Sequence, residues 1–341
     1  MIALSNPGAV GLFLPSARSR ALPPPSHQDL DFAVEPEPAS TSISEVRYPD
    51  LTTRGLLPSS AADLSAIITN LDLDSAERSP HGTGGVYFVS DSMTHERRAV
   101  YKPQSEENDT TGQKGYLKEF AAFVIDNGLA CVPETTIVSV ERQHLPVEIG
   151  SVQAYVAESE DAEDFGPGIF NTEDIHRIGI LDVRILNCDR HSGNLMRNKK
   201  TGKLVPIDHG SAFPSVFDGG LANVSFEWLM YPQARQPFSA ELLDVIANLD
   251  VNADIEKLNT IGVDEGAQIA NWMSTTLLKL GADAGLTLHD IGSMVQRAGD
   301  RSAPSILEDL FHRAVAACVG TDYAEFFDNF AGLAKQHIAC I

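Results

Sequence analysis

The chain has 341 residues, of which 25 are Lys or Arg and 47 are Asp or Glu, and its formal net charge at pH 7 is −22. Such an excess of carboxylates repels polyanions, which argues against nucleic-acid partners and against purely electrostatic attachment to anionic lipid. The apolar fraction is 43%, as in folded proteins, and no run approaches the ~20 apolar residues of a membrane-spanning helix. We therefore expect a soluble, cytoplasmic protein with at most peripheral membrane contact.

Cysteine usage indicates a reducing compartment. The four cysteines, Cys131, Cys188, Cys318 and Cys340, are scattered without any CxxC pair. This pattern argues against a structural zinc site and against a disulfide framework.

The first 58 residues contain nine of the 19 prolines and no sustained apolar period, which predicts a disordered, proline-rich leader over residues 1–58. The pattern changes from about residue 63, and we expect folded structure to begin there. A short helix is predicted from apolar residues at spacings of three and four, namely Leu64, Ile67, Ile68 and Leu71.

Residues 59–157 read as a small β-rich lobe that carries one helix. Two β-rich segments, 86–90 and 98–102, flank a polar turn and follow a glycine cluster, which is typical of a hairpin. An apolar face that includes Leu117 and Phe120 predicts a helix that ends near Gly128. Two further strands are expected at 135–140 and 152–157.

Residues 158–341 read as a larger, mostly helical lobe. An acidic segment at 158–164 is a candidate linker, after which Asn171 or Thr172 can cap a helix that runs to about Leu186. Apolar periodicity then predicts further helices at 240–249, 264–280, 287–297, 305–318 and 322–336.

Three features of the first lobe favour a nucleotide site. The glycine cluster can surround a phosphate with backbone N–H groups, although it is equally typical of a turn before a strand. Lys102 ends the paired strand, where its ammonium can reach such phosphates, and Glu119 on the following helix is its natural partner. The residues of the cluster that would contact phosphate are Gly82, Thr83, Gly84 and Gly85.

The second lobe carries the strongest signal, at residues 175–196 and 203–214. A long apolar helix delivers a loop that contains Asp189, Arg190, His191 and Asn194, and an apolar strand delivers Asp208. Phosphoryl transfer needs one carboxylate to orient the attacking hydroxyl, and an Asn plus an Asp to hold Mg²⁺. A zinc site built on the histidines lacks both cysteines and the HExxH pattern.

Several ordered blocks of sequence resemble the catalytic core of phosphatidylinositol 3- and 4-kinases, most closely the plant-type gamma (type II-like) phosphatidylinositol 4-kinases. The blocks are GGVYFVSD, VYKP, GYLKEFAAFVID, HRIGILDVRILNCDRHSGNL, LVPIDHG and FEWLMYPQARQPFS, within about residues 79–260. The resemblance implies an α+β, bilobal, protein-kinase-like fold with a small β-rich N-lobe and a larger, mostly helical C-lobe. It also implies transfer of the γ-phosphate of ATP to the inositol headgroup of phosphatidylinositol.

The same resemblance assigns roles to individual residues. Lys102 would contact the ATP phosphates and Glu119 would pair with it. Asp189 would orient or deprotonate the acceptor hydroxyl, and Asn194 and Asp208 would hold Mg²⁺ or Mn²⁺.

The remaining assignments depend on the same motifs. His191 would serve as a base or charge stabiliser, with a hydrogen-bonding loop residue as the alternative, and Arg190 is expected to act beside it as a catalytic residue. The backbone of the hinge would meet adenine at Gln153, Ala154, Tyr155 and Val156.

The acceptor is left open by the sequence. Residues 209–234 contain no Lys or Arg, which argues against acceptors that already carry several phosphates. Phosphatidylinositol and a Ser/Thr side chain of a protein both remain, and a pseudokinase scaffold is a further alternative.

Two features bear on membrane contact. Phe226 and Trp228 would either insert among acyl chains or pack beneath the second lobe. A basic cluster could face anionic lipid or form a solvated turn, namely Arg197, Lys199, Lys200 and Lys203.

Overall fold

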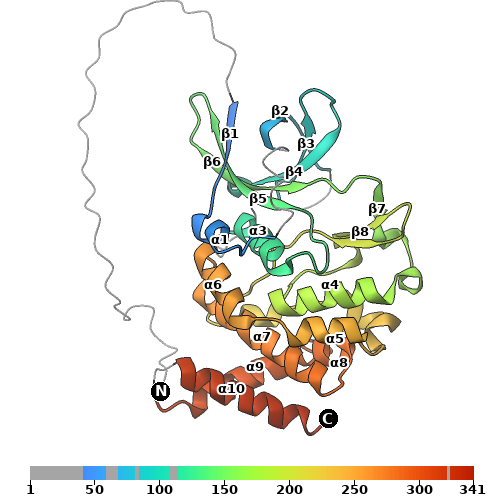
Figure 1. Ribbon diagram of the computed structural model, residues 1–341, viewed down its shortest axis with the longest axis vertical. Coiled ribbons are helices and arrows are strands. Elements are labelled where there is room, and N and C mark those ends of the chain that lie inside the picture. Colours follow the sequence, from blue (N-terminus) through green and yellow to red (C-terminus); the bar gives the residue numbers. More distant parts are fainter. Residues whose placement is uncertain (1–40, 59–67, 81–83, 108–113, 321–322) are drawn as a thin grey trace, which may run out of the picture.

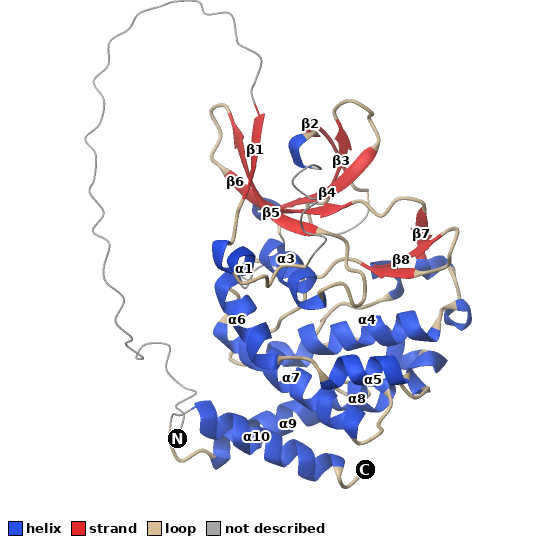
Figure 2. Cartoon of the chain, in the orientation of Figure 1, coloured by secondary structure: helices blue, strands red, loops and turns tan. Residues whose placement is uncertain are grey.

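The computed structural model describes residues 41–58, 68–80, 84–107, 114–320 and 323–341. Within these ranges the strands of a curled sheet form one lobe and helices form the other, with a smaller sheet beside them (Figure 1, Figure 2). The predicted bilobal α+β architecture is therefore confirmed.

The first lobe is a six-stranded sheet in the order β1-β5-β6-β4-β3-β2, and every neighbouring pair is antiparallel. Alternate residues such as Val89, Tyr101, Val140 and Val152 are buried together on its concave side because successive side chains of a strand point to opposite faces. The strands are β1 (Thr41–Glu45), β2 (Leu71–Arg78), β3 (Tyr87–Asp91), β4 (Arg97–Pro103), β5 (Thr135–Arg142) and β6 (Glu148–Ala154).

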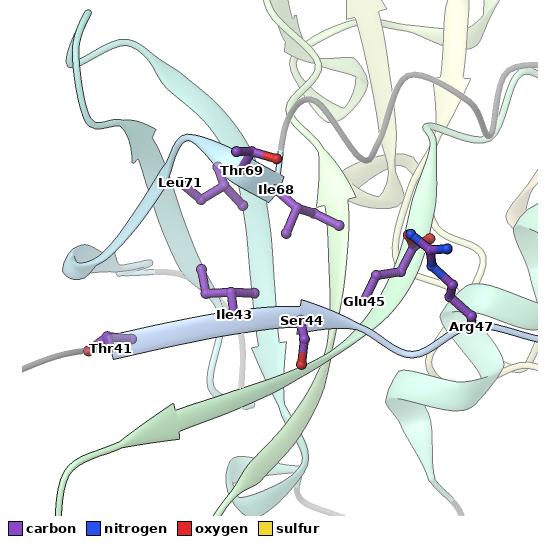
Figure 3. Close-up of a pocket in the computed structure, with 8 residues that line it drawn as sticks. All are labelled: Thr41, Ile43, Ser44, Glu45, Arg47, Ile68, Thr69 and Leu71. Atoms are coloured by element: carbon purple, nitrogen blue, oxygen red, sulfur yellow. The ribbon is translucent and has the colours of Figure 1, made fainter.

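The two edge strands of this sheet curl toward each other. Thr41 Oγ1 of β1 donates a hydrogen bond to Asp74 Oδ1 of β2 at 2.8 Å. Farther along the two edges a cavity of about 460 Å³ remains open, and Ile43 points across it toward Ile68 and Leu71 (Figure 3). The sheet thus comes close to a barrel without closing.

Helix α3 (Gly115–Asp126) lies between the sheet and the helical lobe and is buried at every position after its first. It ends as predicted, with Asn127 in the left-handed region followed by Gly128 at φ 84°. The carboxylate of Asp126 accepts the backbone N–H groups of Ala130 at 2.7 Å and Val132 at 3.0 Å. These bonds fix the turn that leads into β5.

The second lobe is built around α4 and α7, which share one core with α3. Asn171 caps α4 by accepting the N–H of Glu173 at 2.7 Å, as the sequence predicted. A small antiparallel sheet, β7 (Ser159–Asp161), β8 (Leu195–Asn198) and β9 (Leu204–Pro206), joins this lobe. The helices are α4 (Thr172–Ile185), α5 (Ala240–Ala247), α6 (Val251–Ile261), α7 (Glu265–Asp283), α8 (Leu288–Val295), α9 (Ile306–Ala317) and α10 (Tyr323–Ile338).

The predicted leader is too long. Residues Thr41–Glu45 form β1, and Leu51 of helix α1 (Pro49–Thr53) is fully buried. Ile43 is the only apolar residue of this edge strand. The sequence therefore shows no alternation of apolar and polar residues by which the strand could be predicted. Residues 1–40 lie outside the described part of the chain.

Two other predictions are corrected, and one helix was missed. Leu71 begins β2 rather than ending a helix, while Leu64 and Ile67 fall outside the described residues. Strand β6 ends at Ala154, because the chain then leaves the sheet for β7. Helix α6 was missed, since only its polar cap and a few apolar residues mark it in the sequence.

Candidate active site

Three charged side chains from distant parts of the chain meet between the lobes. Lys102 on β4 donates hydrogen bonds through Nζ to Glu119 Oε1 of α3 and to Asp208 Oδ1 at 2.8 Å. Glu119 is almost fully buried, whereas the side chain of Asp208 is about half exposed. Lys102 is therefore held by a buried carboxylate on one side and by a half-exposed carboxylate on the other.

The two buried groups of this cluster keep their charges. Burial alone would lower the pKa of Lys102, but the carboxylates of Asp208 and Glu119 outweigh it and raise that pKa. Burial alone would raise the pKa of Glu119, but the ammonium of Lys102 outweighs it and lowers that pKa. A desolvated ion pair of this kind favours the charged form of both partners.

Asp208 follows β9 in a strained backbone conformation. Its φ is 56°, in the left-handed region that a residue with a side chain adopts only when its surroundings hold it there. The next residue supplies one such restraint, because the backbone N–H of His209 donates to Glu119 Oε2 at 3.0 Å. Glu119 thus fixes both Lys102 and the segment that carries Asp208.

The loop after α4 carries Asp189, whose side chain is 58% exposed and lies close enough to Asp208 to feel its charge. The N–H of Asp189 donates to Asn187 Oδ1 at 2.9 Å, and its backbone carbonyl accepts Asn194 Nδ2 at 2.8 Å. Burial, followed by the nearby charge of Asp208, raises the pKa of the Asp189 carboxyl, and His191 opposes this in part. The backbone of Asn194 in turn accepts the N–H of Ile207 at 3.1 Å, which ties the loop to the residue before Asp208.

Asn194 and Asp208 carry side-chain oxygen atoms, which suit a hard divalent cation. The hydrogen bond between Ile207 and Asn194 joins the two segments that carry them. Among the residues the structure describes, no group of three His, Cys, Asp or Glu side chains is placed to hold a metal ion. A cation at this site would need further ligands from phosphate. The donor set fits Mg²⁺ or Mn²⁺ that arrives with a nucleotide.

His191 is half exposed beside Asp189. Its Nε2 lies 3.9 Å from Asp189 Oδ1, and its Nδ1 accepts the N–H of Gly193 at 3.1 Å. Because Nδ1 is an acceptor, a neutral ring carries its proton on Nε2. The proton-bearing nitrogen is thus the one that faces Asp189.

Arg190 is buried, although the sequence placed it among the catalytic residues. Its side chain is 1% exposed, and its Nε lies 3.0 Å from Asp182 Oδ2. Its Nη1 donates to the backbone carbonyls of Asn194 at 2.6 Å and Ile207 at 2.9 Å. Arg190 is therefore a positioning residue that holds the loop and the Asp208 segment together.

Asp182, which sequence reasoning missed, is the partner that makes this possible. It is fully buried on α4 and also accepts Trp228 Nε1 at 3.0 Å and Asn187 Nδ2 at 3.1 Å. A carboxylate within the apolar run of the helix, beyond the acidic first turn, was the available signal, because buried charges are almost always paired.

Glu227 was also missed, and it joins residues 209–234 to the loop that carries Asp189. Its Oε2 accepts the N–H of Ser192 at 2.7 Å and its Oε1 accepts the hydroxyl of Tyr231 at 2.9 Å. On either side of it Phe226 and Trp228 are buried and stacked, with ring centroids 4.7 Å apart. Packing beneath the second lobe, rather than insertion among acyl chains, is confirmed for these two aromatic residues.

The glycine cluster is only partly described. Gly82 and Thr83 lie outside the described residues, whereas Gly84 and Gly85 precede β3. The N–H of Gly85 donates to the carbonyl of Glu106 at 3.2 Å, and a Cβ on Gly85 would lie 2.4 Å from Glu106 Cβ. This close approach is a structural reason for glycine at that position.

The expected hinge lies where the chain passes from β6 to β7. Gln153 is buried, and its Nε2 donates to Thr135 Oγ1 at 2.9 Å. The N–H of Tyr155 donates to the carbonyl of Arg98 at 2.9 Å, which keeps the segment beside the strand that carries Lys102. Val156 follows at the boundary of the two lobes.

The family model described as "Phosphatidylinositol 3- and 4-kinase" matches residues 84–291, which contain every described residue of this site. The chain belongs to this family. The predicted resemblance is therefore confirmed.

The chain is similar to several curated members of the family. It is 33% identical over 310 residues to phosphatidylinositol 4-kinase gamma 4 of Arabidopsis thaliana, covering 78% of this chain and 54% of the relative. It is 37% identical over 289 residues to gamma 1 of the same plant, with coverage of 71% and 50%. For gamma 4 of Oryza sativa the identity is 33% over 297 residues, with coverage of 76% and 52%. The chain thus spans about half the length of these relatives.

Among solved structures, a chain of the Shewanella oneidensis HipA, HipB and operator DNA complex aligns with 90% of this chain and 73% of its own length. The identity is 10% and the TM-score is 0.24, too low to bear on fold or function.

Proposed function

We propose that this protein is a phosphatidylinositol 4-kinase that transfers the γ-phosphate of ATP to the inositol headgroup. The observation that carries the proposal is the meeting of Lys102, Glu119 and Asp208 beside the loop of Asp189, within a chain of the phosphatidylinositol 3- and 4-kinase family. Positioning and charge stabilisation account for most of the catalysis of phosphoryl transfer. The site offers both.

In this proposal the N-lobe binds the nucleotide. The ammonium of Lys102 contacts ATP phosphates, and Glu119 fixes its direction. Backbone N–H groups of the glycine cluster at 82–84 add to the phosphate contacts, whereas the N–H of Gly85 is bonded to Glu106, and the backbone of residues 153–156 meets adenine. We place the boundary between the lobes after residue 157, so that 59–157 and the packed residues of 41–58 form the N-lobe and 158–341 form the C-lobe.

The C-lobe supplies the acceptor chemistry. Asp189 orients the inositol hydroxyl and takes up its proton as the hydroxyl oxygen bonds to the γ-phosphorus and ADP leaves, and His191, 3.9 Å from Asp189, helps to hold that carboxylate ionised before the transfer. Asn194 and Asp208 would hold Mg²⁺ or Mn²⁺. The cation neutralises phosphate charge when it is bound.

A kinase whose acceptor is a lipid must contact the membrane that contains it. None of the described helices combines the length and the apolar content that crossing a bilayer requires, so we propose peripheral attachment of a cytoplasmic protein. The basic cluster is poorly suited to this role. Arg197 lies 2.7 Å from Glu160, and Lys200 lies 3.5 Å from Glu158, so acidic neighbours compensate part of its charge.

An exposed apolar pair offers a better contact. Met230 is 82% exposed and Ile169 is 56% exposed. Their chain neighbours Tyr231 and Phe170 pack together with ring centroids 5.9 Å apart, and Tyr231 bonds to Glu227 beside the catalytic loop. We propose that Met230 and Ile169 enter the bilayer surface next to the acceptor site.

A side-by-side transfer assay tests the function. Labelled ATP is offered with phosphatidylinositol vesicles and with generic protein substrates, and Asp208→Asn serves as the inactive control. We expect label in the lipid at the 4-position, and none with the variant. Label in protein but never in lipid would establish the Ser/Thr kinase alternative, which the cation-free segment 209–234 also suits. Absence of transfer to either would favour a scaffold.

A further inference from the structure

Residues 41–57, which we name the strap, lie outside the range matched by the kinase family model and pack against the helix that carries Glu119. The strap begins as β1, in register with β5 from Thr41 opposite Arg142 to Glu45 opposite Val138. The N–H of Val46 then donates to the carbonyl of Ile137 at 2.9 Å. The sheet thus fixes one end of the strap.

The middle of the strap contacts α3 through an aromatic stack, and a buried leucine anchors it in the same core. The ring of Tyr48 stacks on that of Phe120, with centroids 5.2 Å apart and planes inclined by 25°. Leu51 is fully buried in the core that also contains Phe120 and Phe123. Burial raises the pKa of Tyr48 to about 12, so its phenol remains neutral and the contact is one between uncharged rings.

The far end of the strap rests on the helical lobe. Helix α1 contacts α6, and α6 also contacts α3, which places α1 beside α3 and above α6 (Figure 1). The ion pair of Arg54 and Glu256, 3.3 Å apart, is exposed on both sides and contributes little. The strap is therefore held mainly by its strand pairing and by Tyr48 and Leu51.

The position of α3 matters because Glu119 makes three contacts from it. One carboxylate oxygen bonds to Lys102, and the other accepts the N–H of His209 and lies 3.6 Å from its ring. Phe120, on which Tyr48 stacks, is the next residue of the same helix. A rotation of α3 that breaks the stack would also withdraw Glu119 from Lys102.

We propose that Tyr48 and Leu51 of the strap are positioning residues that hold α3 in the orientation at which Glu119 meets Lys102. This inference rests on the proposed kinase function for its catalytic consequence. Its structural part, control of α3 by the strap, stands apart from the identity of the acceptor.

The test uses full-length protein and four variants. Tyr48→Ala and Leu51→Ala remove the contacts, and Tyr48→Phe keeps the ring without the hydroxyl. Leu310→Ala is the matched control, because Leu310 is also a fully buried leucine outside the family match, on α9. Hydrogen exchange of residues 115–126, thermal stability, and kcat and KM for ATP are measured for each.

We expect Tyr48→Ala to speed amide exchange in α3 and to lower kcat/KM for ATP about tenfold, as the energy of one aromatic stack allows. Tyr48→Phe should restore both values. Leu51→Ala should behave like Tyr48→Ala, and Leu310→Ala should lose stability without changing α3 exchange. Should Leu51→Ala fail to fold, the two Tyr48 variants still decide the question.

Unchanged α3 exchange in Tyr48→Ala would overturn the inference. Equal losses of kcat/KM in Leu310→Ala and Tyr48→Ala would overturn it as well, because both effects would then reflect stability alone. If wild-type protein transfers no phosphate, the proposed function fails, whereas the exchange data still report on the strap.

Discussion

The carboxylate of Asp208 accepts a hydrogen bond at 2.8 Å from the ammonium of Lys102, which lies 106 positions earlier in the chain. The same ammonium also bonds to Glu119. A cation that binds Asp208 must therefore compete with Lys102 for this carboxylate. Nucleotide binding is expected to exchange the partners of Asp208 while Glu119 keeps its hold on the lysine.

We predict that ATP stabilises the protein only together with a divalent cation, because Asp208 repels phosphate unless a cation lies between them. A ligand at 100 times its Kd stabilises a fold by about 2.7 kcal/mol. Thermal-shift titrations with and without Mg²⁺ measure this effect, and Asp208→Asn should abolish its metal dependence. Equal shifts with and without Mg²⁺ in wild-type protein would contradict the metal assignment.

Asp189→Asn should separate turnover from nucleotide binding. The side chain of Asp189 is 58% exposed and makes no contact with Lys102, so the amide should leave the Mg·ATP thermal shift unchanged. Turnover should fall by about 10²- to 10⁴-fold, as expected when a general base is lost. Full transfer activity in this variant would show that Asp189 does not orient the acceptor.

The acid side of the pH–activity profile should report on Asp189. Its carboxyl must be ionised to accept a proton, and burial raises its pKa above the ordinary value of 3.8. The midpoint of the fall in activity should therefore lie at a pH above 3.8 as the solution is acidified. His191 opposes the rise in this pKa, so His191→Gln should move this limb to still higher pH. A limb that stays in place would show that His191 does not act on Asp189.

The residues proposed to perform the chemistry could be named from the sequence because phosphoryl transfer requires particular residue types in a particular order, and three of them, Lys102, Glu119 and Asp208, meet in the structure. The residues that hold these side chains in place could not be predicted from the sequence. Glu227 reaches the loop from 35 positions away and Trp228 reaches Asp182 from 46, and nothing local marks such contacts. The strap was missed for a related reason, since its backbone pairing with β5 leaves no mark in the sequence and only one buried leucine and one ring add to it.

Glu119→Gln should destabilise the protein and remove part of its sensitivity to acid. Breaking a buried ion pair by removing one charge typically costs about 3–5 kcal/mol. The pKa of Glu119 is lowered in the folded state, so its stabilisation is present above the ordinary pKa of 4.5 and is lost as the pH falls further. Denaturant titrations at neutral and acidic pH should show a smaller difference between wild type and variant in acid. A constant difference would contradict a charged Glu119.

The last prediction concerns the membrane contact. Burying a methionine side chain stabilises binding by about 1.5–3 kcal/mol, so Met230→Ser should weaken activity on phosphatidylinositol vesicles by about tenfold or more, and Ile169→Ser should add to the loss. Met93→Ser is the matched control, because Met93 is also 82% exposed but lies in the β3–β4 turn of the other lobe. Transfer to a short-chain, water-soluble phosphatidylinositol should be unaffected in all three variants, which separates docking from chemistry.

An apolar contact should also resist salt, whereas a contact through the basic cluster would weaken as ionic strength rises. If Met93→Ser matches Met230→Ser on vesicles, Met230 is not a specific bilayer contact. If alanine at Arg197, Lys199, Lys200 and Lys203 abolishes vesicle activity while Met230→Ser does not, the basic hairpin rather than Met230 faces the bilayer.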